Sequence, residues 1–178
     1  MQSSFDAQLL AAIAAQTQTL REILAHLQQP KLGFGEAPSL YRIYANRSNN
    51  CLWYTVQDGE ALPIEHASVT GYVTELKFEK VTRRGKETAK LHVCLQGDRP
   101  YCIESGHDSH FSKCILSAIA VTPKALLQSQ PLTIAPQAGD DESVLFARVY
   151  IAGNQVVAPY SEQTDWRSVA LAAKEAIG

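Results

Sequence analysis

Two histidines and a cysteine lie close together in the segment GHDSHFSKC, and these residue types can ligate zinc. His110 and Cys114 are four residues apart, which is about one turn of a helix, and His107 precedes them. No CxxC or HxxxH pair accompanies them to complete a tetrahedral site. Cys114 also falls on the apolar face of the expected helix. We therefore expect a buried thiol and no metal site.

The same segment contains the residue types of a catalytic triad at Asp108, Ser109 and His110. Neighbours in sequence rarely acquire triad geometry, and the GxSxG nucleophile turn is missing. The phosphate-binding patterns GxxxxGK[ST] and GxGxxG are missing as well. We expect Asp108 or Ser109 to cap a helix, and we expect no enzymatic activity, no catalytic residue and no cofactor.

A second group of residues has the composition of a nucleic-acid contact. Single-stranded nucleic acid needs cations along its phosphate path and flat side chains on which bases stack. One long stretch supplies the cations Lys77, Lys80, Arg83, Arg84, Lys86 and Lys90, with the aromatic residues Tyr72 and Phe78 between them. Glu75, Glu79 and Glu87 dilute this charge, so an ordinary solvated hairpin is the alternative interpretation.

An earlier segment adds further aromatic and basic candidates: Tyr41, Arg42, Tyr44, Arg47, Trp53 and Tyr54. Alternation along a strand sends about half of such side chains into the core, and the sequence does not show which half. Arg99 and Tyr101, beside a later turn, are weaker candidates of the same type.

Residues 1–29 predict a long amphipathic helix that ends at Pro30. An apolar seam recurs along it at alternating steps of three and four residues: Leu10, Ile13, Thr17, Leu20, Leu24 and Leu27. This heptad spacing is typical of a coiled coil, so the helix is expected to associate subunits or, alternatively, to dock on the body of its own chain. Residues 30–39 contain Gly33, Gly35 and Pro38 and predict a flexible linker.

Residues 40–160 predict a β-rich body. LYRIYA and CLWYTVQ indicate a hairpin across the turn-forming NRSNN. SVTGYVTELKFEKV is too long for an ordinary strand, and its apolar positions change phase after Val73, which predicts a bulge or bend. Two strands, a helix with Phe111, Ile115 and Ile119 on its core face, and two more strands follow. Residues 161–178 predict a C-terminal helix.

This order of a long bent strand, two strands, a helix and two strands resembles the OB-fold. The resemblance covers about Ser68 to Val157 and implies a mainly β, α+β protein. The expected architecture is an OB-fold-like five-stranded barrel with an added N-terminal hairpin, a long N-terminal helix and a C-terminal helix. Within that fold the chain looks most like the single-stranded DNA-binding proteins, although its C-terminus, LAAKEAIG, is not the acidic tail of bacterial members. In OB-folds the loop joining the first two strands borders the ligand groove, which is where the basic stretch falls.

The composition sets the remaining expectations. The chain has 178 residues, 46% of them hydrophobic, and a net charge of −2, which excludes a wholly disordered protein and requires any basic surface to be local. No apolar run approaches the roughly 20 residues that span a bilayer, and the start of the chain does not resemble a secretory signal. The four cysteines lack paired spacing and are expected to be reduced thiols. We expect a cytoplasmic protein with no membrane partner.

These observations together predict a non-catalytic protein that binds single-stranded nucleic acid, with DNA as the first candidate and RNA left open. The basic hairpin and the stacking aromatic residues are expected to make the contact, and the N-terminal helix to form a homo-oligomer. The alternative is a protein-interaction module, in which an OB-like core is a scaffold and the terminal helices dock a protein partner.

Overall fold

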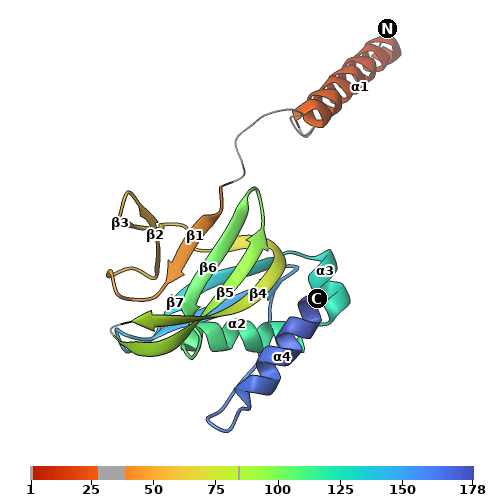
Figure 1. Cartoon of the computed structure of the whole chain (residues 1–178). Helices are drawn as coiled ribbons and strands as arrows, with labels where there is room; N and C mark the ends of the chain where they lie inside the picture. Colours follow the sequence, from red (N-terminus) through yellow and green to blue (C-terminus); the bar gives the residue numbers. More distant parts are fainter. Residues whose placement is uncertain (1, 28–38, 84) are drawn as a thin grey trace. The chain divides into compact units, whose positions relative to one another are not determined.

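The structure, a computed structural model, describes residues 2–27, 39–83 and 85–178 (Figure 1). The chain divides into two units, residues 1–37 and residues 38–178. The predicted linker, residues 30–39, lies outside the described residues except for Ser39. Among the described helices, none is long and apolar enough to cross a membrane.

The first unit contains helix α1, Gln2–Leu27. The side chains of the seam that the structure describes are all exposed: Leu10, Ile13, Thr17, Leu20 and Leu24. Ile23, beside the seam, is exposed as well. The hydroxyl of Thr17 donates a hydrogen bond to the carbonyl of Ile13 at 2.8 Å, so it is satisfied within the helix. The side chain of Leu27, the last seam residue, lies outside the described ones.

The second unit is built on one nine-stranded sheet with the order β3-β2-β1-β6-β5-β4-β7-β8-β9. Its strands are β1 (Tyr41–Ala45), β2 (Trp53–Gln57), β3 (Glu60–Pro63), β4 (Val69–Arg83), β5 (Lys86–Gln96), β6 (Pro100–Gly106), β7 (Leu132–Ala138), β8 (Leu145–Ile151) and β9 (Asn154–Gln155). Neighbours are antiparallel except β1 and β6, which are parallel. The fold class is therefore α+β with an open mixed sheet.

The predicted five-stranded barrel is wrong, because both strands that would close it have other partners. The free edge of β6 pairs with β1, from Tyr41 opposite Tyr101 to Tyr44 opposite Glu104. The free edge of β8 pairs with the short strand β9. The hairpin that was expected as an addition to a barrel instead extends the sheet, and β3 extends it further.

Strand β4 bends, as the phase change in its sequence predicts. Its register against β5 shifts between Val73 and Glu75, and it passes from pairing with β7 to pairing with β5. Gly71 lies at this passage, and a Cβ there would stand 2.9 Å from the carbonyl oxygen of Gln96. Only glycine allows the two backbones to approach so closely.

Three helices complete this unit: α2 (His110–Val121), α3 (Lys124–Ser129) and α4 (Trp166–Ile177). Helix α2 lies against the sheet, and α4 packs on α2 and on β4 (Figure 1). The predicted core face of α2 is confirmed, since Phe111, Ile115 and Ile119 are fully buried among Leu91, Ile103 and other strand residues. The helices thus pack mainly against β4, β6 and β8, and not against the end of the sheet that β1, β2 and β3 form.

Candidate nucleic-acid interface

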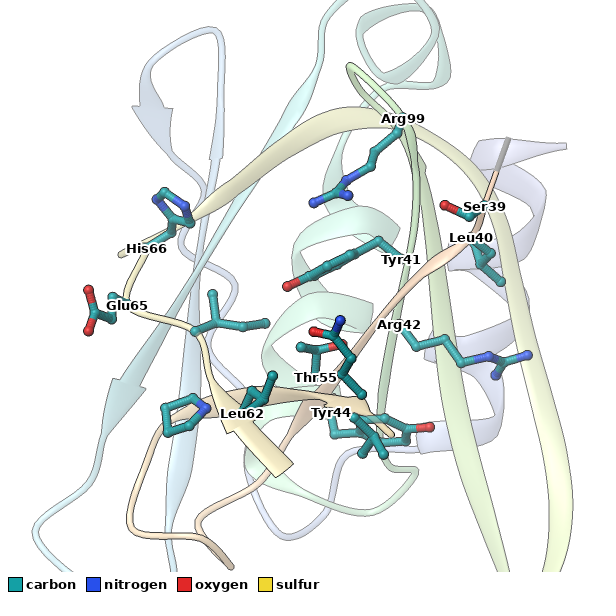
Figure 2. A pocket seen from close by; sticks show the side chains of 14 residues that line it. Ser39, Leu40, Tyr41, Arg42, Tyr44, Thr55, Leu62, Glu65, His66 and Arg99 are labelled. Atoms are coloured by element: carbon teal, nitrogen blue, oxygen red, sulfur yellow. The ribbon is translucent and has the colours of Figure 1, made fainter. Parts of the chain in front are cut away.

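A groove of about 1070 Å³ lies where strands β1, β2 and β3 curl beside the turn between β5 and β6 (Figure 2). Its lining includes three aromatic rings and two guanidinium groups: Tyr41, Tyr44, His66, Arg42 and Arg99. A second cavity of about 430 Å³ is lined by Tyr41, Ile64, His66 and Arg99 as well. Because these four residues line both spaces, the two cavities adjoin, and we call them together the aromatic groove.

Arg99 and Tyr41 stand where the two cavities meet. The guanidinium carbon of Arg99 is 4.1 Å from the centre of the Tyr41 ring (Figure 2). It is 5.5 Å from the centre of the Tyr101 ring. The two tyrosine rings meet edge to face, with centres 5.8 Å apart. The parallel pairing of β1 with β6 produces this cluster, because it places Tyr41 opposite Tyr101. The cluster offers a planar cation and aromatic surface to a ligand.

A carboxylate lies beside this cation. The hydroxyl of Tyr101 donates a hydrogen bond to Oδ1 of Asp98 at 2.6 Å, and this bond lowers the pKa of the Asp98 carboxyl below its usual range. Asp98 lines the smaller cavity together with Ser68 and Thr70. The smaller cavity of the aromatic groove therefore holds one carboxylate beside the Arg99 cation, and Glu65 adds a second carboxylate to the lining of the larger one.

Tyr44 and Tyr54 form a second flat surface at the groove. Their rings are stacked, with centres 5.3 Å apart and planes 20° apart, because β1 and β2 place them directly opposite each other. Arg42, on the same face of β1 as Tyr44, is exposed. Arg42 lines the groove, whereas Tyr54 stacks on Tyr44 without lining it, and the roles of both in binding stay predictions.

Trp53 and Arg47 do not occupy such positions. Only 2% of the Trp53 side chain is exposed, and its indole N–H donates to the carbonyl of His66 at 3.0 Å. Trp53 is therefore a core residue that fixes the backbone beneath the groove, and the prediction that bases stack on it is wrong. Arg47 is half-buried and donates to the carbonyl of Val144 at 3.4 Å, which directs it away from the groove.

Two lysines of the basic hairpin of β4 and β5 lie beside glutamates. Lys77 lies 3.3 Å from Glu79, and Lys90 lies 3.6 Å from Glu104, where both side chains are largely buried. Lys80 and Tyr72 are exposed. Arg84 and the side chains of Arg83 and Lys86 lie outside the described part of the chain.

Phe78 faces the helices rather than solvent. It is half-buried against the core, and the ammonium of Lys174 in α4 lies 5.4 Å from its ring centre. The alternation of β4 places Phe78 on the same side as the buried Leu76, and it does not line the aromatic groove, so its role as a stacking residue stays a prediction.

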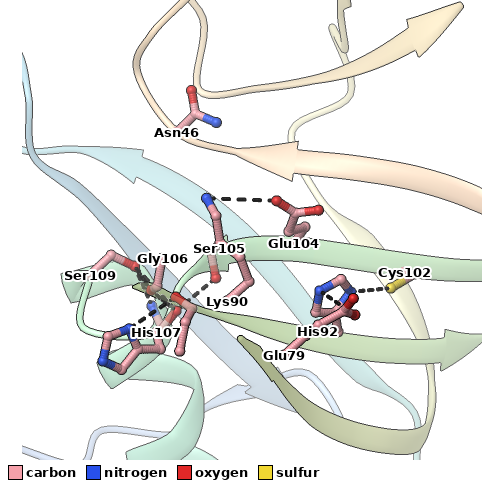
Figure 3. A network of polar contacts seen from close by, with 12 residues as sticks. Asn46, Glu79, Lys90, His92, Cys102, Glu104, Ser105, Gly106, His107 and Ser109 are labelled. Carbon is pink, nitrogen blue, oxygen red and sulfur yellow. Dashed lines mark hydrogen bonds and ion pairs between the residues drawn. The ribbon is translucent and has the colours of Figure 1, made fainter. Parts of the chain in front are cut away.

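A network of polar side chains crosses the face of the sheet between the hairpin and the groove (Figure 3). Buried His92 lies 3.6 Å from a carboxylate oxygen of Glu79, and its Nδ1 lies 3.5 Å from the sulfur of Cys102. Burial raises the pKa of the Cys102 thiol to about 12. The thiol is thus held neutral and unreactive at physiological pH.

The polar residues of the segment GHDSHFSKC cap helix α2 or pair with neighbouring groups of the fold. Ser109 caps α2 by accepting a hydrogen bond from the backbone N–H of Ser112, whereas Asp108 pairs with Lys113 at 2.6 Å. His107 Nδ1 lies 2.9 Å from the carbonyl of Ala89, and His110 Nδ1 lies 2.9 Å from the hydroxyl of Tyr160. Among residues 2–27, 39–83 and 85–178, no group of three or more metal-ligating side chains comes together.

Comparison with known proteins gives no further guidance: no family model matches the chain, and no curated protein or solved structure matches it significantly.

The sequence patterns made Arg99 and Tyr101 weaker candidates and did not indicate Asp98 or His66, although all four residues line the aromatic groove. The turn QGDRPY contains the signal, because an aspartate, an arginine and a tyrosine within four residues can interact across one hairpin end. Their importance depends on the parallel pairing with Tyr41, almost 60 residues earlier, which no local pattern indicates.

Proposed function

We propose that this chain binds single-stranded nucleic acid, DNA in the first instance, without catalysing a reaction on it. The observation that carries the proposal is the exposed guanidinium of Arg99 over the ring of Tyr41 inside a trough that Arg42 also lines. Arginine planes and tyrosine rings stack on bases of any sequence, and the guanidinium groups attract phosphates. Tyr44, whose ring stacks on that of Tyr54, lines the same trough and adds a second aromatic ring to it.

The basic hairpin contributes a smaller, electrostatic part. Lys80 is exposed on β4, and the sequence adds Arg83, Arg84 and Lys86 at the tip. Cations of this kind contact phosphates without reading bases, so they strengthen binding at low salt. Replacing Arg83, Arg84 and Lys86 together with alanine is expected to weaken binding and to flatten its salt dependence.

The proposal is tested by titrating the full chain into a fluorescein-labelled oligo-dT at low and high salt and recording anisotropy. We expect a micromolar or lower Kd at low salt, and a log–log salt slope between about −1 and −3 for a few phosphate contacts. Oligo-U serves as the matched RNA probe, and duplex DNA is the negative control. Absence of binding at low salt contradicts the proposal.

We also propose that α1 associates copies of the chain. The exposed apolar side chains of Leu10, Ile13, Leu20 and Leu24 repeat at heptad spacing, which suits pairing with identical helices. Association would place several grooves on one strand and raise affinity through effective concentration. Light scattering tests this association. We expect the full chain to be a multimer and a variant lacking residues 1–29 to be a monomer.

The same exposed seam favours a second candidate function, a protein-interaction module. Removal of residues 1–29 separates the two functions, because it abolishes capture of a protein partner but only weakens binding of nucleic acid. A cytoplasmic location is part of the proposal and agrees with four cysteines that are unpaired thiols in the described structure. Cell fractionation tests that location.

A further inference from the structure

The smaller cavity of the aromatic groove contains a group that phosphate binding does not explain. Asp98 lines it beside Arg99, and a carboxylate repels the phosphates that the arginine attracts. The Tyr101 hydroxyl donates a hydrogen bond of 2.6 Å to Oδ1 of this carboxylate and fixes its position, and an aspartate carboxylate is ionised at neutral pH. An ionised carboxylate only accepts hydrogen bonds. The cavity is therefore built to receive donors.

Among the DNA bases, guanine presents two adjacent donors on its Watson–Crick edge, N1–H and the N2 amino group. Adenine and cytosine each present one amino group beside a ring-nitrogen acceptor, and thymine presents one N–H between two carbonyls. A carboxylate with two oxygens pairs fully with guanine and faces a repelling acceptor on each of the other bases.

We infer that the smaller cavity selects guanine within a single strand, with the Asp98 carboxylate accepting hydrogen bonds from N1–H and N2–H of the base. The inference rests on the proposed function, since the strand must first occupy the groove. Arg99 follows Asp98 directly and supplies a plane on which the same base stacks. Ser68 and His66 line the same cavity and supply possible donors to the guanine O6.

The test compares labelled oligo-dT with the same oligomer carrying one central dG, dA or dC, titrated into the full chain. We expect the dG oligomer to bind at least about fivefold more tightly than oligo-dT, because a bidentate contact to a base provides a gain of this size. The dA and dC oligomers should bind like oligo-dT. An oligomer with central deoxyinosine is the matched control. It keeps N1–H but lacks the N2 amino group, so most of the preference is lost.

Asp98→Asn is the variant that assigns the role to this residue. Asp98 is exposed, so the replacement leaves the fold intact, which thermal unfolding verifies. We expect the variant to lose the preference for dG, measured as the ratio of its Kd for oligo-dT to its Kd for the dG oligomer. Tyr101→Phe removes the hydroxyl that orients the carboxylate and reduces the preference partly.

Two results overturn the inference while leaving the proposed function intact: oligo-dT binds with salt dependence but dG gives no gain, or the dG preference survives in Asp98→Asn. If no oligomer binds at low salt, the proposed function fails, and the inference fails with it.

Discussion

The basic hairpin and the aromatic groove differ in how they use their charges. On the hairpin, Lys77 and Lys90 each lie within 3.6 Å of a glutamate, and Phe78 turns toward the helices. At the groove, Arg99 lies over a tyrosine ring, and Arg42 is exposed nearby. The hairpin holds more cations in its sequence, whereas the groove presents cations and rings together in a concave space.

This difference shows that the density of charge in a sequence does not measure the charge available to a ligand. A lysine paired with a glutamate contributes little net field, while a guanidinium on an aromatic face keeps its charge and adds a stacking plane. For a ligand with both phosphates and bases, the second arrangement contributes more to binding. The groove is therefore expected to dominate affinity.

The largest effect is expected from the double replacement Tyr41→Leu with Arg99→Ala. It removes a stacking ring and a cation from the junction of the two cavities, so oligo-dT should bind about tenfold more weakly or worse. Fluorescence anisotropy measures the loss, and a thermal unfolding curve confirms that the variant is folded. An unchanged Kd would place the binding surface elsewhere.

The replacement Trp53→Phe separates the core from the groove. It removes a buried hydrogen bond to His66 and leaves unfilled volume, which should lower the free energy of unfolding by about 1–3 kcal/mol in a urea titration. The folded protein should lose less affinity for oligo-dT than the groove double variant does. A larger loss of affinity with unchanged stability would show that Trp53 contacts bases.

A smaller effect is expected from the way in which the free energy of unfolding depends on pH through Cys102. The pKa of Cys102 is raised from 9.0 to about 12, so the folded chain retains a proton that the unfolded chain releases as the pH rises above 9. This contribution to stability is fully present below pH 9 and is lost between there and pH 12. Near pH 9 the decrease is about half a kcal/mol. Urea titrations at several pH values should show that the free energy of unfolding falls more steeply above pH 9 for the unmodified chain than for Cys102→Ala. The same dependence on pH in both chains would contradict the raised pKa of Cys102.

The smallest effect is expected from Lys77→Ala and Lys90→Ala on the hairpin. Since each lysine has a glutamate partner, either replacement should change the Kd for oligo-dT by less than about twofold. Glu79→Gln is the matched control, because it removes the charge beside Lys77 without removing the lysine. A marked gain in affinity from that control would mean that the strand runs along the hairpin after all.

Local patterns in the sequence predicted the elements that depend on neighbouring residues. The core face of α2, the bend in β4 and the hairpin of β1 with β2 are all present. The barrel was wrong because closure depends on which strand reaches the edge of β6, and β1 occupies it by a parallel pairing that spans almost 60 residues. The same distant pairing creates the contact of Tyr41 with Arg99, so the most informative part of the site was outside the reach of local patterns.

The most direct measurement is photo-cross-linking of the full chain to an oligo-dT that contains 5-iododeoxyuridine, followed by peptide mass spectrometry. This base cross-links to aromatic side chains that stack on it, so it maps the path of the strand. The account predicts cross-links at Tyr41, Tyr44 or Tyr54, and their suppression by excess unlabelled oligo-dT. Cross-links confined to Tyr72 on β4, or to the aromatic residues around α4, would contradict it.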